Sequence, residues 1–225
     1  MHDKLGPATS GMRRYSDQDL QISRRLDWRF LLPVPHLRRV AYLGSRNDVL
    51  LAALSQLSDS LTIISGSSWD ATLRCDQSGF DLAVVRSGGR PELEIAHSLL
   101  IPGGLVYWEI DRFAGFRTFR TLASGDLKKI WRPHVLRDSF GLLEGLGFCQ
   151  IEVYWHRPNF EECIEIIPLR NPFALNHVFS RHRVDFPGRL KLAVGWCLLK
   201  SSLLSHLVAC FSLIARKCSI STGAG

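Results

Sequence analysis

The sequence predicts an α/β protein built on a mostly parallel sheet with helices on both faces. Three stretches carry this prediction: V-A-Y-L-G-S-R-N-D over 40–48, F-D-L-A-V-V over 80–85 and L-L-I-P-G-G-L-V-Y-W-E-I-D over 99–111. Each is a short apolar run bounded by glycine, serine or charged residues, and helix-like segments lie between them. Because ligands bind beyond the carboxyl ends of parallel strands, we expect function near the residues that end the strands. These residues are Gly44, Ser65, Arg86 and Glu109.

The first half of the chain is expected to alternate helices and strands. Ser16 and Asp19 resemble a capping box, which predicts that a helix begins at Ser16. The apolar stretch over 27–33 is expected to pack on the edge of the sheet. A further helix, capped by Asn47 or Asp48, should follow the first strand. The predicted strands are 40–43, 61–65, a short 71–74 and 80–85, and the predicted helix is 49–57.

The second half is expected to continue the same pattern. Pro91 stands at the first position of a helix that runs to Leu99, a position where proline is tolerated. Pro102-Gly103-Gly104 is expected to make a tight turn into the next strand, on the far side of the sheet from the ligand. Residues 171–189 are expected to be irregular. The other predicted elements are strands over 105–110, 149–155 and 208–215, an apolar run over 163–169, and helices over 135–146 and 190–207.

The three stretches, in this order and spacing, resemble a class I S-adenosylmethionine-dependent methyltransferase. F-D-L-A-V-V over 80–85 is similar to the fourth strand of that family, and L-I-P-G-G-L-V-Y over 100–107 to its turn and fifth strand. G-L-G-F over 145–148 is typical of the end of its last helix. The resemblance covers residues 40–155, with looser support to Lys217. It implies a Rossmann-like, mostly parallel seven-stranded sheet whose closing strand is inserted antiparallel beside the sixth.

The resemblance implies S-adenosylmethionine as the cofactor, although the glycine-rich motif of the family is eroded. Tyr42 stands where the family has an acidic residue, and Arg46 and Asp48 stand where it has its second and third glycines. Arg46 would have to swing away, fill the space itself, or bind an anion at the start of the helix. The cofactor contacts implied by the resemblance are Gly44, Ser45, Asn47, Ser65 and Asp76, of which Ser65 replaces an acidic residue.

Substrate-side residues are expected at the ends of the fourth and fifth strands. They are Arg86, Trp108, Glu109 and Asp111. Methyl transfer is mainly a matter of holding two reactants in line, and a general base is sometimes added. Glu109, Asp111 and His134 are the candidates for such a base, and the sequence assigns no catalytic residue.

Two functions are compatible with the resemblance. The first is methyl transfer to a small molecule or a glycoconjugate, because W-x-x-P over 155–158 and I-I-P-L over 166–169 resemble a part of the family associated with glycoconjugate or natural-product pathways. The second is a non-catalytic relative that serves as a binding or scaffolding partner, because two cofactor positions have changed and fold alone does not establish function. A nicotinamide dehydrogenase is disfavoured, since only Gly44 remains of the expected G-x-G-x-x-G.

The composition is that of an ordinary, mildly basic globular protein. It is 46% hydrophobic and 22% charged, and its formal net charge is +7. Such a charge could favour an acidic substrate, nucleic acid or an anionic membrane surface. Arginines and aromatic residues interleave over 113–133, where they could stack bases and pair phosphates. Because dense Lys/Arg tracts are absent, this stretch is interpreted as a lid or surface face, and nucleic acid is not expected as a partner.

The six cysteines are expected to be reduced thiols of a cytoplasmic protein. They are Cys75, Cys149, Cys163, Cys197, Cys210 and Cys218, and no two form C-x-x-C. Metal binding is not expected either, because the spacing of His177, His182 and Asp185 fits no standard site.

A chain of 225 residues predicts one domain with a full core. The resemblance divides it into an N-terminal helical segment over 1–39 that covers the sheet or the substrate pocket, a methyltransferase-like domain over 40–217, and a loose tail over 218–225. Within the domain, residues 157–190 or so are expected to form an irregular insertion.

The expected location is cytoplasmic, because the first residues lack the apolar core of a secretory signal. Residues 192–215 are long enough to span a membrane, but Lys200, His206 and four serines interrupt them. Peripheral membrane contact through 190–207 is the alternative. A protein partner is also compatible with the sequence.

Overall fold

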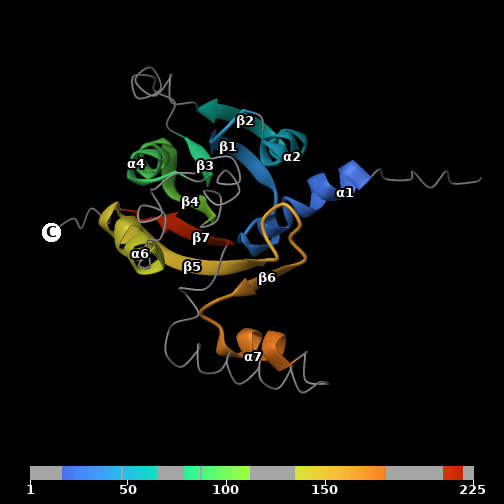
Figure 1. The fold of residues 1–225 in the computed structure, drawn as a ribbon. Coiled ribbons are helices and arrows are strands. Elements are labelled where there is room, and N and C mark those ends of the chain that lie inside the picture. Colours follow the sequence, from blue (N-terminus) through green and yellow to red (C-terminus); the bar gives the residue numbers. More distant parts are fainter. Residues whose placement is uncertain are drawn as a thin grey trace, which may run out of the picture.

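The computed structural model describes residues 17–46, 48–64, 79–86, 88–111, 135–180 and 210–219. Its elements follow the predicted alternation of helices and strands (Figure 1). In chain order they are α1 (Asp17–Arg24), the 3-10 helix η1 (Asp27–Leu31), β1 (Leu37–Leu43), α2 (Val49–Leu57), β2 (Ser58–Ile64), β3 (Phe80–Arg86), α4 (Arg90–Leu99), β4 (Leu100–Asp111), α6 (Val135–Gly145), β5 (Phe148–Arg157), β6 (Glu165–Pro168), α7 (Pro172–Ser180) and β7 (Cys210–Lys217).

Seven strands of the described chain form one sheet in the order β2-β1-β3-β4-β7-β5-β6. Strands β2, β1, β3 and β4 run parallel, whereas β7 is antiparallel to both of its neighbours and β6 is antiparallel to β5. The predicted insertion of the closing strand beside the strand over 149–155 is therefore confirmed. The edge strand β6 lies in the apolar run predicted over 163–169, and the short strand predicted over 71–74 lies outside the described residues.

Helices cover both faces of this sheet, as predicted. Along β1, Val40 and Tyr42 point into a core shared with α1, η1 and α2, whereas Ala41 and Leu43 point into a second core shared with α4 and α6. Figure 1 shows α1 and α2 on one side of the strands and α4 and α6 on the other. Because successive side chains of a strand alternate between its faces, a strand buried on both sides has a continuous apolar sequence rather than an alternating one.

The segment over 27–33 packs against the middle of the sheet, so the prediction that it lies on the sheet edge is wrong. Trp28 is fully buried and stacks on Tyr107 of β4, with 3.8 Å between the ring centroids. Phe30, by contrast, is exposed. The tight turns of a 3-10 helix send neighbouring side chains in different directions. The indole is therefore directed into the core and the phenyl ring toward solvent.

Two further predictions are corrected by the backbone. The first is the irregular stretch over 171–189, because residues 172–180 form α7. Asn171 caps this helix, since its side-chain oxygen accepts hydrogen bonds from the amides of Phe173 at 3.0 Å and Ala174 at 3.2 Å. Pro172 occupies the first helical position, which suits proline. These capping signals were present in the sequence.

The second correction concerns Pro102-Gly103-Gly104, which lies inside β4 and does not make a turn before it. The pairing of β3 with β4 shifts here, because Phe80 pairs with Leu100 whereas Leu82 pairs with Leu105. Gly103 takes a φ of +81°, which only glycine adopts readily. The two glycines therefore allow a bulge within the strand.

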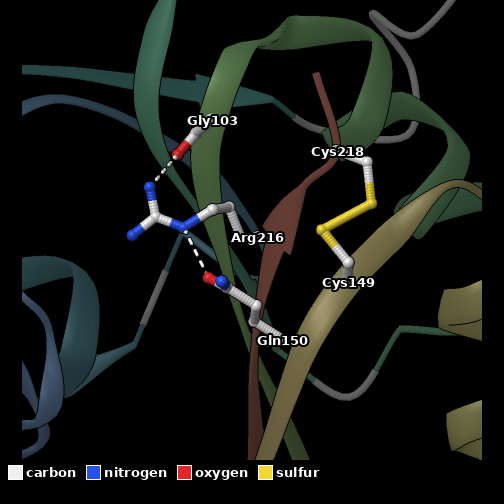
Figure 2. The surroundings of a disulfide bond; sticks show 5 residues. All are labelled: Gly103, Cys149, Gln150, Arg216 and Cys218. Atoms are coloured by element: carbon white, nitrogen blue, oxygen red, sulfur yellow. Dashed lines mark hydrogen bonds between the residues drawn. A yellow bond between two sulfur atoms is a disulfide. The ribbon is translucent and has the colours of Figure 1, made fainter. Parts of the chain in front are cut away.

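Two of the six cysteines are joined, which corrects the prediction of reduced thiols at these positions. Cys149 at the start of β5 forms a disulfide with Cys218 beyond the end of β7, and their Cα atoms are 5.7 Å apart (Figure 2). Antiparallel pairing of β5 with β7 brings the two residues together, and the amide of Cys218 donates to the Gly147 carbonyl. Among the described cysteines, Cys163 and Cys210 are buried and take part in no disulfide.

The helices of the described segments include none with the length and apolar character needed to cross a bilayer. The helix predicted over 190–207 lies outside these segments.

Reduction of the disulfide is expected to destabilise the fold. The bridge closes a loop with a sequence separation of 69, and the chain-entropy argument gives it roughly 4 kcal/mol of the free energy of unfolding. Urea unfolding with and without dithiothreitol would measure this difference. The Cys149→Ser/Cys218→Ser protein is the control, and its stability should not respond to dithiothreitol. An equal response in both proteins would contradict the prediction.

Candidate functional site

The carboxyl edge of the parallel strands gathers charged side chains from five parts of the chain. Five residues, here called the edge cluster, meet there: Arg25, Asp48, Arg86, Glu109 and Glu161. Arg86 ends β3 and pairs in register with Glu109 on β4, whereas Asp48 lies at the start of α2. The loop between β5 and β6 contributes Glu161. The structure therefore brings together the predicted ends of β3 and β4, and adds three residues from elsewhere in the chain.

A buried ion pair between Arg25 and Glu109 lies at the base of the edge cluster. The two guanidinium NH₂ groups donate to the two carboxylate oxygens at 2.7 Å and 2.6 Å, and the residues are 2% and 1% exposed. The hydroxyl of Tyr107 also donates to Glu109, at 3.0 Å. Burial lowers the pKa of Arg25, but attraction by Glu109 raises it, and the net pKa is higher than usual. Arg25 is therefore charged at every physiological pH, and its planar guanidinium pairs with the two oxygens of the carboxylate through two parallel hydrogen bonds.

Asp48 connects the end of β1 to the start of α2. Its carboxylate accepts the Leu50 amide at 2.9 Å as the helix cap, and it accepts the Tyr42 hydroxyl at 2.7 Å. Of the two predicted caps, the structure thus supports Asp48. Burial, as the largest cause, raises the pKa of Tyr42 to about 12. The phenol is consequently neutral at physiological pH and acts as a hydrogen-bond donor.

Arg86 links these groups across the strand ends. One of its NH₂ groups is paired with Asp48, and the other donates to Glu161 at 2.6 Å. Its Nε lies 3.9 Å from Glu109. Arg86 is 26% exposed, whereas the Asp48 side chain is only 3% exposed. The guanidinium thus lies at the boundary between the buried carboxylates and solvent.

A second buried polar group supports the edge cluster from β5 and β7. His156 Nε2 is 2.8 Å from the Ser212 hydroxyl, and its Nδ1 is 3.6 Å from the Cys163 sulfur. Phe160 packs on His156 and under the guanidinium of Arg25. Burial, with a smaller contribution from Arg25, lowers the pKa of His156 to about 3. The imidazole is therefore neutral in the folded protein.

The predicted site residues differ in burial, and several of them lie outside the described residues. Trp108 is buried and donates its indole N–H to the Gly88 carbonyl at 3.1 Å. Asp111 is half-buried at the end of β4, and Ser45 is exposed after β1. Asn47, Ser65, Asp76 and His134 lie outside the described residues, so their roles remain predictions.

Arg25, His156 and Glu161 were not predicted from the sequence. No local signal marks them, because Arg25 reaches a partner 84 positions away and His156 reaches one 56 positions away. Their roles follow from strand order and from the placement of the N-terminal segment on the sheet.

The surroundings of Gly44 are relevant to cofactor binding, because the resemblance places a cofactor contact at this glycine. A Cβ added to Gly44 would lie 2.5 Å from the Tyr42 hydroxyl, so the chain itself fills that side of the glycine. Arg46 is exposed, and its side chain is not among the atoms nearest to that position. Arg86 instead spans from β3 to Asp48 over the end of β1. Gly44 therefore has no space for a side chain in this conformation, and Arg86 and Asp48 are joined beside it. The described residues include no group of three or more His, Cys, Asp or Glu that could hold a metal ion.

Comparison with known proteins identifies the fold. No protein-family model matches the sequence, and no curated protein matches it. A solved S-adenosylmethionine-dependent methyltransferase from Thermotoga maritima, described as a possible histamine N-methyltransferase, is 14% identical and covers 88% of this chain and 89% of its own, with a TM-score of 0.50. Together with the strand order, this likeness shows that the chain has the fold of class I S-adenosylmethionine-dependent methyltransferases. At this identity it shows the fold alone.

Two other solved structures have lower TM-scores. A methyltransferase from Archaeoglobus fulgidus is 12% identical, covers 90% of this chain and 95% of its own, and has a TM-score of 0.46. A putative methyltransferase from Bacillus halodurans is 11% identical, covers 91% of this chain and 100% of its own, and has a TM-score of 0.42.

Loss of the Glu109 charge is expected to destabilise the protein strongly. Glu109→Gln leaves the buried guanidinium of Arg25 without its counter-charge, which should cost about 3 kcal/mol in urea unfolding. The double variant Arg25→Met/Glu109→Leu should recover most of that loss, because no charge is then left buried. Glu94→Gln, which breaks the exposed Arg90–Glu94 pair, is the control and should change stability by less than about 0.5 kcal/mol. A similar small effect of Glu109→Gln would count against the prediction.

His156 should make stability fall on acidification. Its pKa is lowered in the folded state to about 3, so the unfolded chain binds more protons between that value and the unfolded pKa near 6.5. This stabilising contribution is full above that unfolded pKa and is lost as the pH falls toward 3. Between pH 7 and pH 5 the free energy of unfolding should drop by roughly 2 kcal/mol from this group. In His156→Gln the drop should shrink to the smaller contribution of His97, whose pKa is also lowered. An unchanged pH slope would exclude His156 as the cause.

Proposed function

We propose that this chain is an S-adenosylmethionine-dependent methyltransferase that acts on a small molecule or a glycoconjugate. The observation that carries the proposal is the sheet, in which four parallel strands are followed by β7 inserted antiparallel between β4 and β5. The fold of this chain is similar to that of a solved S-adenosylmethionine-dependent methyltransferase. The glycoconjugate class rests on the resemblance of residues 155–158 and 166–169 described above.

The proposed ligand site is the carboxyl edge, where the cofactor would supply the methyl group. Gly44, Ser45 and Asn47 after β1, Ser65 after β2, and Asp76 are the proposed cofactor contacts. Because Arg86 joins Asp48 to Glu161 across this edge in the described conformation, the proposal includes a second conformation with an open edge. The chain contributes by binding and aligning its ligands, which is the main demand of methyl transfer.

Two of the proposed substrate residues are partly exposed and two are buried. Arg86 and Asp111 are partly exposed and are the proposed contacts for the acceptor. Trp108 and Glu109 are buried and hydrogen-bonded within the protein, so we assign them positioning roles. Glu109 holds Arg25 and lies beside Arg86, and it is not available as a general base while the Arg25 pair is intact.

Three features of the cellular context also remain proposals. They are a cytoplasmic location, contact with a protein partner, and peripheral membrane contact through 190–207. A cytoplasmic location requires the Cys149–Cys218 pair to be reduced there, because disulfides persist mainly in oxidising compartments.

Calorimetric titration with S-adenosylmethionine and S-adenosylhomocysteine tests the proposed function. Both should bind with micromolar dissociation constants, whereas NAD, as the control ligand, should not bind. Ser45 and Ser55 are both exposed and offer a matched pair of variants. Ser45→Trp should weaken binding by at least about tenfold by blocking the edge, and Ser55→Trp should leave it unchanged.

Absence of binding would contradict the enzyme proposal. The result must hold at millimolar ligand in the wild-type protein and in the Arg86→Gln protein introduced below. It would favour the alternative of a non-catalytic protein that acts through binding or scaffolding.

A further inference from the structure

Arg86 is held at the carboxyl edge from two opposite sides. Asp48, at the start of α2, binds one NH₂ group, and Glu161, in the loop between β5 and β6, binds the other. These partners come from opposite halves of the sheet, since β1 and β5 are separated by β3, β4 and β7. The guanidinium therefore forms a bridge across the ends of the central strands, where a ligand of this fold class would enter.

We propose that Arg86 is an autoinhibitory bar, which closes the carboxyl edge by joining Asp48 to Glu161 and must release both before a ligand binds there. The inference rests on the proposed function, because the closed edge is the proposed cofactor site. In this proposal the described conformation is the closed one, and Arg86 controls how often the edge opens.

Release of Arg86 leaves each buried carboxylate with other hydrogen-bond donors. Asp48 keeps the Tyr42 hydroxyl and the Leu50 amide. Glu109 keeps both NH₂ groups of Arg25 and the Tyr107 hydroxyl. Opening of the bar therefore removes the counter-charge of Asp48 but leaves both carboxylates hydrogen-bonded, which limits the penalty. Arg86 is already 26% exposed, and its side chain can move into water without crossing the core.

The contact on the loop side is the weaker of the two. Glu161 is 42% exposed, and an ion pair between partly exposed groups contributes little to stability. The loop itself is held by Phe160, which is buried against Arg25 and His156, and by the Ile164 amide, which donates to the Arg157 carbonyl at 2.8 Å. Opening should thus begin at Glu161, while Phe160 keeps the loop attached to the sheet.

The test compares three variants in two measurements. Arg86→Gln removes the bar, and Glu161→Gln removes only its exposed partner. Arg216→Gln is the matched control, because Arg216 is half-buried and bonds to Gly103 and Gln150 at the opposite edge (Figure 2). The first measurement is the dissociation constant for S-adenosylhomocysteine, and the second is hydrogen exchange of the amides over 158–164 without ligand.

The bar predicts a coordinated change in both measurements. Arg86→Gln should bind S-adenosylhomocysteine about tenfold more tightly than the wild type, since a larger fraction of the protein is open. Glu161→Gln should shift affinity in the same direction by a smaller factor, and Arg216→Gln should not shift it. Amide exchange over 158–164 should be faster in both edge variants and unchanged in the control.

The two measurements distinguish failure of the proposed bar from failure of the proposed function. Equal or weaker binding by Arg86→Gln would overturn the bar, because Arg86 would then be neutral or a ligand contact, while the proposed function would stand. Faster exchange in Arg86→Gln with no binding by any protein would support the bar and count against the function. Unchanged exchange in both edge variants would overturn the bar even if Arg86→Gln folded poorly, since Glu161→Gln alters only an exposed side chain.

Discussion

The buried ion pair of Arg25 with Glu109 fixes the arrangement of the carboxyl edge. It fastens the segment after α1 to β4 through two short hydrogen bonds between residues 84 positions apart. Two charges taken out of water stabilise a fold only when geometry and further hydrogen bonds offset their desolvation, and Tyr107 supplies one such bond. With this pair in place, Trp28 can stack on Tyr107, and Phe160 can pack under Arg25. The N-terminal segment and the β5–β6 loop thus meet over one carboxylate.

The departures from the methyltransferase pattern are physically connected. Tyr42 stands where the resembled family has an acidic residue, and Asp48 stands where it has a glycine, and in this chain the two side chains hydrogen-bond to each other. The same contact places the Tyr42 hydroxyl where it excludes any side chain at Gly44. Arg86 then neutralises Asp48 from the neighbouring strand. In this chain the turn after β1 is therefore held by side chains that contact one another, Tyr42 with Asp48 and Asp48 with Arg86.

Prediction from sequence succeeded where the signal was local or periodic. The strands β1 and β3, the helices α2 and α4 and the closing strand β7 all lie where apolar runs and caps placed them, because each is specified by neighbours within a few residues. It failed for α7 and the P-G-G bulge, where the same residue types fit both a turn and another structure. It also missed the Cys149–Cys218 bond and the partners of Glu109, which depend on strand order and register rather than on any local pattern.

The sequence by itself determined the α/β class and the residues that end β3 and β4, because composition and periodicity decide which segments are buried. The tertiary structure alone decided what those strand ends do. It paired Glu109 with Arg25, filled the space at Gly44 with Tyr42, and placed Arg86 between Asp48 and Glu161. The physical reason is that a buried charge needs an oppositely charged or hydrogen-bonding partner to offset its desolvation, and this partner determines its role. That partner can come from any element that packs against the same edge.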